Sequence, residues 1–264
     1  MKAFVLRRFA IAFALLVVVC AGLARAADLA YSVPNSDPLY PSPPWTFKGN
    51  RGLLIIFKSD PEVLKKLVPA PLIPNADGTV AMWIGEYKVV EPFVLPYTEF
   101  GMSITSTLNG KSVEYSTNLY LDDDAAITAG REVWGWPKKH AVMSYQQSGG
   151  KVVATVKRKG VEIVRATFEA TGDLPIKPAD PLMLANLKTI PSVRAGAKPD
   201  VQQITGTPVS DTVRVLKSGK ATLQLRSSPD DPLGKIPVKE ILDAMYSESD
   251  FVLPLGEVLH DYLK

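Results

Sequence analysis

The chain has 264 residues, and its 30 basic and 27 acidic side chains give a formal charge of +3. Four of the basic residues and none of the acidic ones fall within positions 1–26, so the net charge becomes −1 once that segment is removed. This balance gives no support to nucleic acid or an anionic membrane as a partner. Cys20, the only cysteine, lies in the same segment, so residues 27–264 offer no thiol for a disulfide or a metal site, and two histidines are too few for a His-rich zinc site.

Residues 1–26 are predicted to be a cleaved secretory signal peptide. Three basic residues precede a mostly apolar stretch, Phe9–Leu23, and Ala24-Arg25-Ala26 fits a signal peptidase site. The apolar stretch is short for a membrane-spanning helix, so no retained membrane anchor is expected. The sequence therefore predicts export, most naturally to a bacterial periplasm.

The part that follows is predicted to begin with an extended arm. Residues 27–50 contain five prolines, which favour an extended chain over a helix or an inner strand. The apolar run Arg51–Lys58 is typical of a buried strand. Asp60 is expected to cap a short helix over Pro61–Leu67, and a strand is expected from Val80 to about Val90.

The strongest hairpin signal is Asn109-Gly110, between Met102–Leu108 and Lys111–Leu121. Asn-Gly readily adopts the positive φ angles of a tight two-residue turn. Three further pairs of strands are expected to flank the turns Gly149-Gly150, Lys159-Gly160 and Ser218-Gly219.

Few helices are expected in the rest of the chain. Asp123–Gly130 is predicted as a short helix closed by its glycine, with the run Asp122–Asp124 as its cap rather than a metal site. Pro237–Met245 is predicted as a helix with Ile241, Leu242 and Met245 on one face. Residues 51–264 are thus predicted to form a single, mainly β domain, an antiparallel barrel or sandwich. The sequence has neither the alternation of strands and helices nor the Gly-rich phosphate loop that would indicate a nucleotide cofactor.

The segment Gly130–His140 places two adjacent lysines after a bulky apolar run. A lysine that has lost its proton can attack a ketone, and desolvation or a second nearby cation favours that loss. Trp134 and Trp136 would desolvate Lys138, and Lys139 would be the second cation. Most Lys-Lys pairs are solvated, however, and neighbouring residues point apart on helices and strands. Lys139 would act strongly on Lys138 only in an irregular turn or a low-dielectric pocket.

Six short pieces of the chain resemble the acetoacetate decarboxylase superfamily, in order and at near-constant spacing. They are Asn50-Arg51, Tyr97-Thr98-Glu99, Gly130-Arg131-Glu132, Pro137-Lys138-Lys139, Pro237–Ile241 and Asp261–Lys264. The resemblance implies a mainly β fold centred on an antiparallel barrel and assembly into a large homo-oligomer. It also implies decarboxylation of a small keto acid through a Schiff base, with no metal or other cofactor.

The resemblance also implies roles for particular residues. Lys138 matches the lysine that attacks the ketone, and Lys139 matches the neighbour that depresses its pKa. Glu99 and Arg51 match the acidic and basic residues of the pocket. Glu99 is then a proton-handling or orienting group and Arg51 its partner or a carboxylate contact, the alternative being a salt bridge without a chemical role.

Three other positions bear on the shape of the pocket. Trp136 and Trp134 are expected as pocket wall and packing. In one respect the chain departs from the family: Trp83 or Ile84 stands where its decarboxylases can carry a second glutamate, which would favour a larger or more apolar keto acid.

Three functions follow from these patterns. The first is a decarboxylase of acetoacetate or a close 3-oxo acid. The second is an aldolase-dehydratase, a lyase that uses the same lysine on pyruvate-like substrates. The third is a non-catalytic periplasmic barrel that binds a small apolar ligand.

Overall fold

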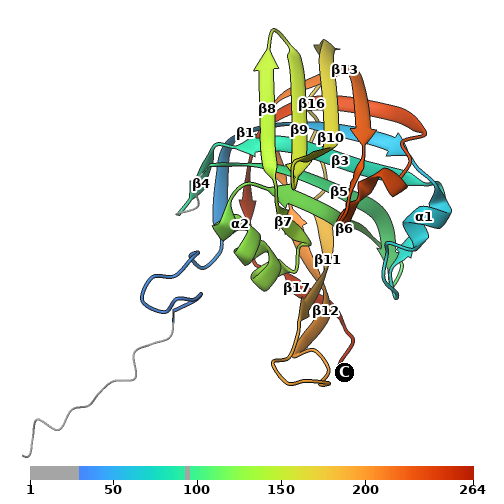
Figure 1. Ribbon diagram of the computed structural model, residues 1–264. Coiled ribbons are helices and arrows are strands. Elements are labelled where there is room, and N and C mark those ends of the chain that lie inside the picture. The colour runs from blue at the N-terminus through green and yellow to red at the C-terminus, as the bar shows by residue number, and fades with distance from the viewer. Residues whose placement is uncertain (1–29, 93–95) are drawn as a thin grey trace, which may run out of the picture. The chain divides into compact units, whose positions relative to one another are not determined.

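The computed structural model describes residues 30–92 and 96–264 (Figure 1). The predicted signal peptide, residues 1–26, lies outside the described residues. The chain divides into a short unit, Met1–Leu39, and a second unit, Tyr40–Lys264. The described residues of the first unit contain no helix or strand. None of the helices in the described ranges has the length and apolar character needed to cross a membrane.

The second unit consists mainly of strands. Its first half forms β1 (Trp45–Lys58), α1 (Pro61–Lys65), β2 (Ile73–Pro74), β3 (Thr79–Tyr87), β4 (Val89–Glu91), β5 (Tyr97–Leu108), β6 (Lys111–Leu121), α2 (Asp124–Ala129), the π-helix η1 (Gly130–Trp134) and β7 (Lys138–His140). Its second half forms β8 (Val142–Ser148), β9 (Lys151–Arg158), β10 (Val161–Asp173), β11 (Leu182–Ile190), β12 (Val201–Val209), β13 (Asp211–Leu225), β14 (Ser227–Ser228), β15 (Asp231–Pro232), the 3-10 helix η2 (Leu233–Lys235), β16 (Glu240–Leu253) and β17 (Glu257–Asp261).

Fifteen of these strands join in one sheet. Its main order is β17-β12-β11-β6-β5-β3-β1-β16-β13-β10-β9-β8, with β2, β4 and β7 attached to β5, β1 and β6. The pairs are antiparallel except where β6 meets β7 and β11. The mainly β prediction is confirmed. The order of the described strands runs between two ends, β17 and β8, so closure into a barrel is not confirmed.

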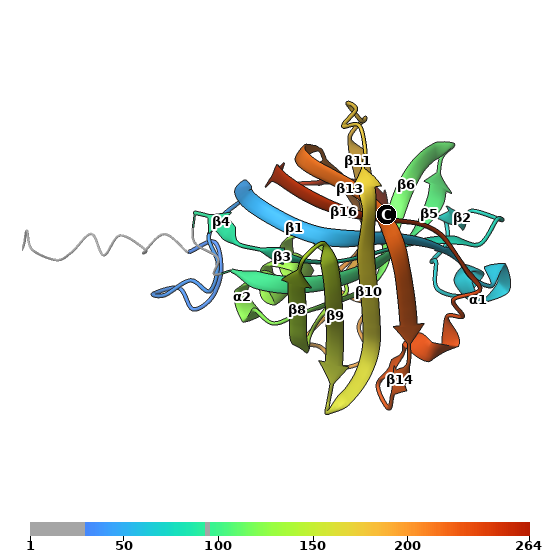
Figure 2. The same cartoon turned by 90° about the horizontal axis from the view of Figure 1, so that it is seen from above.

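The sheet coils back on itself around one core. In both views β8, β9 and β10 run across the direction of β1, β3 and β5 (Figures 1 and 2). Side chains from the two groups of strands pack in the same apolar cluster, for example Ile84 and Phe100 with Val156 and Ala166. This core takes one face of β1, β3 and β5, and their other face is left for the candidate site.

Most local signals in the sequence are confirmed. Asn109 and Gly110 form the hairpin turn with φ of 51° and 76°, and Gly149-Gly150 and Lys159-Gly160 also have positive φ at both residues. Asp60 caps α1, which ends at Lys65, and Asp123 caps α2 by accepting a hydrogen bond from the Ala126 amide.

The predicted turn at Ser218-Gly219 is wrong. These residues lie inside β13, a single strand that pairs with β10 on one side and β16 on the other. A Cβ on Gly219 would lie 2.3 Å from the Phe168 ring. The glycine therefore makes room for a neighbouring side chain rather than for a turn.

The predicted helix over Pro237–Met245 is also wrong. Glu240 begins β16, which pairs with β1 from the Lys58 end onward. The helical spacing of Ile241, Leu242 and Met245 is overridden by this pairing between distant segments, as happens when packing outweighs intrinsic propensity.

Two boundaries differ from those expected. β1 begins at Trp45, so the last part of the predicted arm, residues 45–50, belongs to a strand whose Trp45 and Phe47 are buried. The helix of Asp123–Gly130 does not close at Gly130, because the chain continues as η1. It ends at Gly135, whose φ of 80° is left-handed.

Candidate active site

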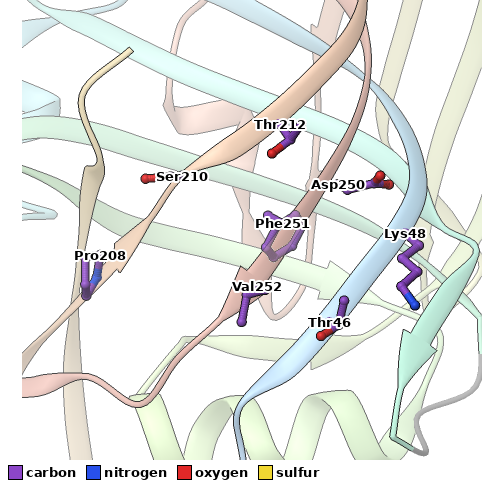
Figure 3. A pocket seen from close by; sticks show the side chains of 8 residues that line it. All are labelled: Thr46, Lys48, Pro208, Ser210, Thr212, Asp250, Phe251 and Val252. Carbon is purple, nitrogen blue, oxygen red and sulfur yellow. The ribbon is translucent and has the colours of Figure 1, made fainter. Parts of the chain in front are cut away.

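A hollow of about 410 Å³ lies over β1, β13 and β16, between side chains such as Thr46, Thr212 and Phe251 (Figure 3). Its two charged side chains already have partners: Lys48 pairs with Glu91 at 2.9 Å, and Asp250 pairs with Arg214. None of the predicted site residues lines this hollow, and the candidate site lies instead around the lysine pair.

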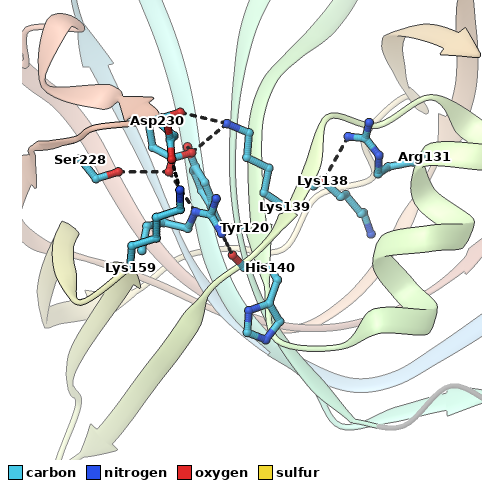
Figure 4. Close-up of polar contacts among 10 residues, drawn as sticks. Tyr120, Arg131, Lys138, Lys139, His140, Lys159, Ser228 and Asp230 are labelled. Atoms are coloured by element: carbon cyan, nitrogen blue, oxygen red, sulfur yellow. Dashed lines mark hydrogen bonds and ion pairs between the residues drawn. The ribbon is translucent and has the colours of Figure 1, made fainter. Parts of the chain in front are cut away.

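The two lysines begin β7, which extends the sheet beside the end of β6. Lys138 comes level with Leu119, and Lys139 with Tyr120. Because successive side chains of a strand point to opposite faces, the two lysines diverge. Figure 4 shows their side chains running in opposite directions.

The Lys138 side chain is buried against an acidic partner. Its Nζ lies 2.9 Å from Glu99 Oε2, and the two side chains are only 5% and 7% exposed. The same Nζ lies 5.0 Å from the Trp136 ring centre and 5.7 Å from that of Tyr97. A primary amine, a carboxylate and two aromatic faces thus meet in a largely buried environment.

The Glu99 carboxylate retains acceptor capacity. Oε1 lies 3.5 Å from the indole nitrogen of Trp83. Oε2 faces Lys138 as an ion pair, but the angle is not that of a hydrogen bond, and no described residue donates one to this atom. A buried oxygen in this condition can accept a proton or a ligand's hydrogen bond.

Gly130 makes room for the lysine. A Cβ at this position would lie 2.4 Å from Lys138 Cδ and 2.8 Å from Cε. The side chain of Lys138 therefore crosses η1 where η1 has no side chain of its own. This close approach explains why position 130 is a glycine although the helix does not end there.

The two tryptophans have different roles. Trp136 faces the amine of Lys138 and stacks on Trp134, with ring centres 5.1 Å apart. Trp134 is 1% exposed, packs edge-on against Trp45, and donates its indole hydrogen to the Pro254 carbonyl at 2.8 Å. Trp136 is thus the wall of the site, and Trp134 supports it from behind.

Lys139 belongs to a separate network centred on Asp231. Its Nζ lies 2.8 Å from Oδ1 of this fully buried carboxylate, and Arg158 Nε lies 2.9 Å from Oδ2. Tyr120 and Ser228 each donate a hydroxyl hydrogen bond to Asp231 at 3.1 Å (Figure 4). Burial opposes ionisation, but the two cations outweigh it and lower the pKa of Asp231 to about 2.

Arg51 also lies outside the group around Lys138. It pairs with Glu86, donates a hydrogen bond to the Gln147 side-chain oxygen at 3.0 Å, and sits over the Tyr145 ring. Arg51 and Glu86 face each other across β1 and β3, whereas Glu99 comes level with the next position, Gly85. Alternation therefore sets Arg51 and Glu99 on opposite faces of the sheet.

The structure thus brings Lys138, Glu99 and Trp136 together and separates them from Lys139 and Arg51. Sequence reasoning gave no role to Tyr97, although alternation along a strand beginning at Tyr97 would have set it beside Glu99. Burial, and then the charge of Glu99, raises the pKa of the Tyr97 hydroxyl well above its usual range. Tyr97 is therefore a neutral wall of the site and not a base.

The described ranges hold no cluster of three or more His, Cys, Asp or Glu side chains with metal-binding geometry. The chemistry that the site residues themselves offer is that of a buried amine beside a carboxylate. Such a pair can form a carbinolamine and an iminium with a ketone, with the carboxylate carrying protons.

Comparison with known proteins identifies the family. Residues 32–263 match acetoacetate decarboxylase (ADC). The chain belongs to the acetoacetate decarboxylase family. Acetoacetate decarboxylase 2 of Mesorhizobium japonicum is 32% identical over 249 residues, which cover 89% of this chain and 90% of the relative. Acetoacetate decarboxylase of Burkholderia multivorans is 31% identical over 253 residues, which cover 89% of this chain and 96% of the relative.

Solved structures agree with this membership of the acetoacetate decarboxylase family. One acetoacetate decarboxylase superposes with a TM-score of 0.82 at 28% identity, covering 89% of this chain and 96% of its own. The enzyme from Legionella pneumophila gives 0.78 at 25% identity, covering 86% and 92%. The enduracididine biosynthesis enzyme MppR gives 0.78 at 19% identity, covering 92% and 98%, which shows a shared fold alone.

Proposed function

We propose that this protein is a Schiff-base decarboxylase that converts acetoacetate, or a close 3-oxo acid, to a ketone and carbon dioxide. The observation that carries the proposal is the buried contact of Lys138 Nζ with Glu99 Oε2, beside the rings of Trp136 and Tyr97. Membership of a family whose named relatives are acetoacetate decarboxylases supports the same reaction.

The first half of the reaction joins Lys138 to the substrate. Glu99 accepts a proton from the Lys138 ammonium, and the neutral amine attacks the ketone carbon to form a carbinolamine. Proton return from Glu99 to the hydroxyl releases water and leaves an iminium ion. The first proton moves between Lys138 Nζ and Glu99 Oε2, which already lie 2.9 Å apart. The second moves from Glu99 to the hydroxyl group on the reacting carbon.

The second half releases the products. The bond between the carboxylate and C2 breaks, and its electron pair forms a C2–C3 double bond that neutralises the iminium as an enamine. Carbon dioxide leaves as a neutral molecule, and the aromatic walls of the site do not disfavour a neutral product. Protonation of C2 restores the iminium, and water adds to it to release the ketone and the Lys138 amine.

The test is reduction with borohydride in the presence of acetoacetate, with carbon dioxide measured in parallel. We expect a reduced adduct on the peptide that contains Lys138 and stoichiometric gas release without the reductant. An adduct with pyruvate but no carbon dioxide from any 3-oxo acid would favour an aldolase-dehydratase. Binding without any adduct would favour a non-catalytic ligand-binding protein.

We also propose that the protein is exported and works as a large homo-oligomer. Export rests on the basic, apolar and Ala24-Arg25-Ala26 pattern of the first residues, and assembly rests on the family resemblance. The sequence of the exported protein should begin at Ala27. Recovery of an intact N-terminus in the membrane fraction would refute cleavage.

A further inference from the structure

Two glycines lie side by side on the face of the sheet that carries Glu99. Gly52 of β1 comes level with Gly85 of β3, and Gly85 with Glu99 of β5. Residues directly opposite each other share a face, so no side chain rises from this row between β1 and the carboxylate. Glycine inside a strand weakens it, and it often marks the approach of a ligand or of another backbone.

Backbone approach accounts for one part of this pattern. A Cβ on Gly85 would lie 2.5 Å from the Arg51 carbonyl oxygen and 3.0 Å from Gly52 Cα. The strands therefore run too close for a larger residue at Gly85. The consequence for the site is a bare strip of sheet, which we call the glycine strip (Gly52 and Gly85), leading away from Glu99.

Apolar side chains border the glycine strip on one side, and on the other side the buried, uncharged amide of Asn50 shares the face of Gly52. The next row along the same face holds Leu54 and Trp83, opposite each other on β1 and β3. A Cβ on Gly101 would lie 2.0 Å from the Trp83 ring. The indole of Trp83 therefore points toward β5, away from β1, and does not cover Gly52. Gly52, Leu54 and Trp83 are all partly exposed, so solvent reaches this border of the strip.

The row continues onto β16. Ser247 comes level with Gly52 and is also partly exposed. Glu99 is the only charged residue in the described row that runs from Ser247 through the glycine strip to Leu121. Arg51 and Glu86, the nearest charges along the chain, point to the other face. A group lying on the strip would find no cation to pair with a second carboxylate.

We infer that the substrate is a 3-oxo acid whose ketone carries a neutral, apolar chain longer than the methyl group of acetoacetate. With the ketone carbon on Lys138, this chain lies along Gly85 and Gly52 toward Ser247. The inference rests on the proposed function, and it names the substrate class of the same site. Each methylene buried on the strip is expected to raise kcat/KM about fourfold.

The experiment measures carbon dioxide release from three substrates. They are 3-oxobutanoate, 3-oxooctanoate and 3-oxooctanedioate, whose tails are a methyl, an apolar chain long enough to pass Gly85 and reach Gly52, and a charged chain. The wild-type protein should favour 3-oxooctanoate over 3-oxobutanoate by about 250-fold in kcat/KM, because four further methylenes are buried. It should also favour 3-oxooctanoate over the diacid, which would place a carboxylate where no cation lies.

Two substitutions locate the effect. Ser247→Phe places a ring beside Gly52, at the far end of the glycine strip, and should lower the ratio of 3-oxooctanoate to 3-oxobutanoate at least about 10-fold. Thr212→Phe, at an exposed position of β13 on the hollow of Figure 3, is the matched control and should keep the wild-type ratio. Ser247→Leu is the smaller substitute if the phenylalanine variant does not fold.

A wild-type ratio of one or less would overturn the inference while leaving the decarboxylase proposal intact. A high ratio unaffected by both Ser247 variants would place the apolar chain elsewhere and would also overturn it. Absence of carbon dioxide and of a borohydride adduct with all three substrates would instead refute the proposed function, and the inference with it.

Discussion

The two faces of β7 carry neighbouring lysines into opposite kinds of environment. Lys138 enters a dry site with one acidic partner, and that partner keeps an oxygen without a hydrogen bond. Lys139 is half exposed and meets a buried Asp231 whose oxygens accept four side-chain donors. The first pair has capacity left for chemistry, whereas the second is saturated and holds β7 in place. Adjacency in sequence is therefore no guide to a shared electrostatic role.

Removal of the Lys138 amine should give the largest effect. Lys138→Ala is expected to lower decarboxylation by about 10⁴-fold or more and to abolish the borohydride adduct, because no other amine lies beside Glu99 in the described residues. Rates of carbon dioxide release and mass spectrometry of the reduced protein measure both. An adduct that persists would assign the nucleophile to another residue.

Neutralising the acid on the same face comes next. Glu99→Gln preserves shape but cannot shuttle a proton, so kcat should fall about 10²- to 10³-fold. Glu86→Gln is the matched control, because Glu86 lies on the opposite face with Arg51. Equal losses in the two variants would contradict the separation of the two faces.

Displacing Lys138 without removing it should have a smaller effect. Gly130→Ala places a methyl group where Lys138 Cδ and Cε lie. The lysine chain is flexible, so the fold should persist while kcat falls about 10- to 100-fold through misplacement of the amine. Gly110→Ala, whose added Cβ meets open space but whose φ of 76° strains it, controls for backbone effects.

On the other face of β7, the expected effect is on stability. Asp231 has a pKa of about 2 when folded against 3.8 as a free side chain. Its contribution, about 2 kcal/mol, is therefore present above pH 4 and is lost as the pH falls toward 2. Asp231→Asn should be less stable by about 3 kcal/mol at pH 6, because it leaves Lys139 and Arg158 without their charge partner.

Guanidinium unfolding of both proteins between pH 6 and pH 2 measures this difference. The variant should lose about 2 kcal/mol less than the wild type over the acid range. Parallel curves for the two proteins would show that Asp231 is not the buried, ion-paired group described above.

Local signals predicted local structure well. Asn109-Gly110, the double-glycine turn and the caps at Asp60 and Asp123 depend on backbone angles and hydrogen bonds within a few residues. By contrast, β16 and the centre of β13 depend on pairing with β1 and β10, which are remote in sequence. A helical apolar spacing and a Ser-Gly pair could not reveal those partners.

The candidate site divides in the same way. Lys138 and Glu99 could be named from short motifs because the resemblance fixed their positions. The sequence did not reveal that Arg51 meets Glu86 instead of Glu99, because register between strands decides which face each residue takes. Gly130 appeared to be a helix end, and only the path of the Lys138 side chain explains it.

The pH profile of kcat/KM in Lys139→Met and Lys139→Arg tests the separation of the two faces most directly. Because the Lys139 charge is committed to Asp231 and points away from Lys138, both variants should keep the wild-type profile, while Lys139→Met lowers the melting temperature. The contradicting result is a Lys139→Met enzyme that is folded, loses most activity at pH 7 and regains it at higher pH, with Lys139→Arg close to wild type.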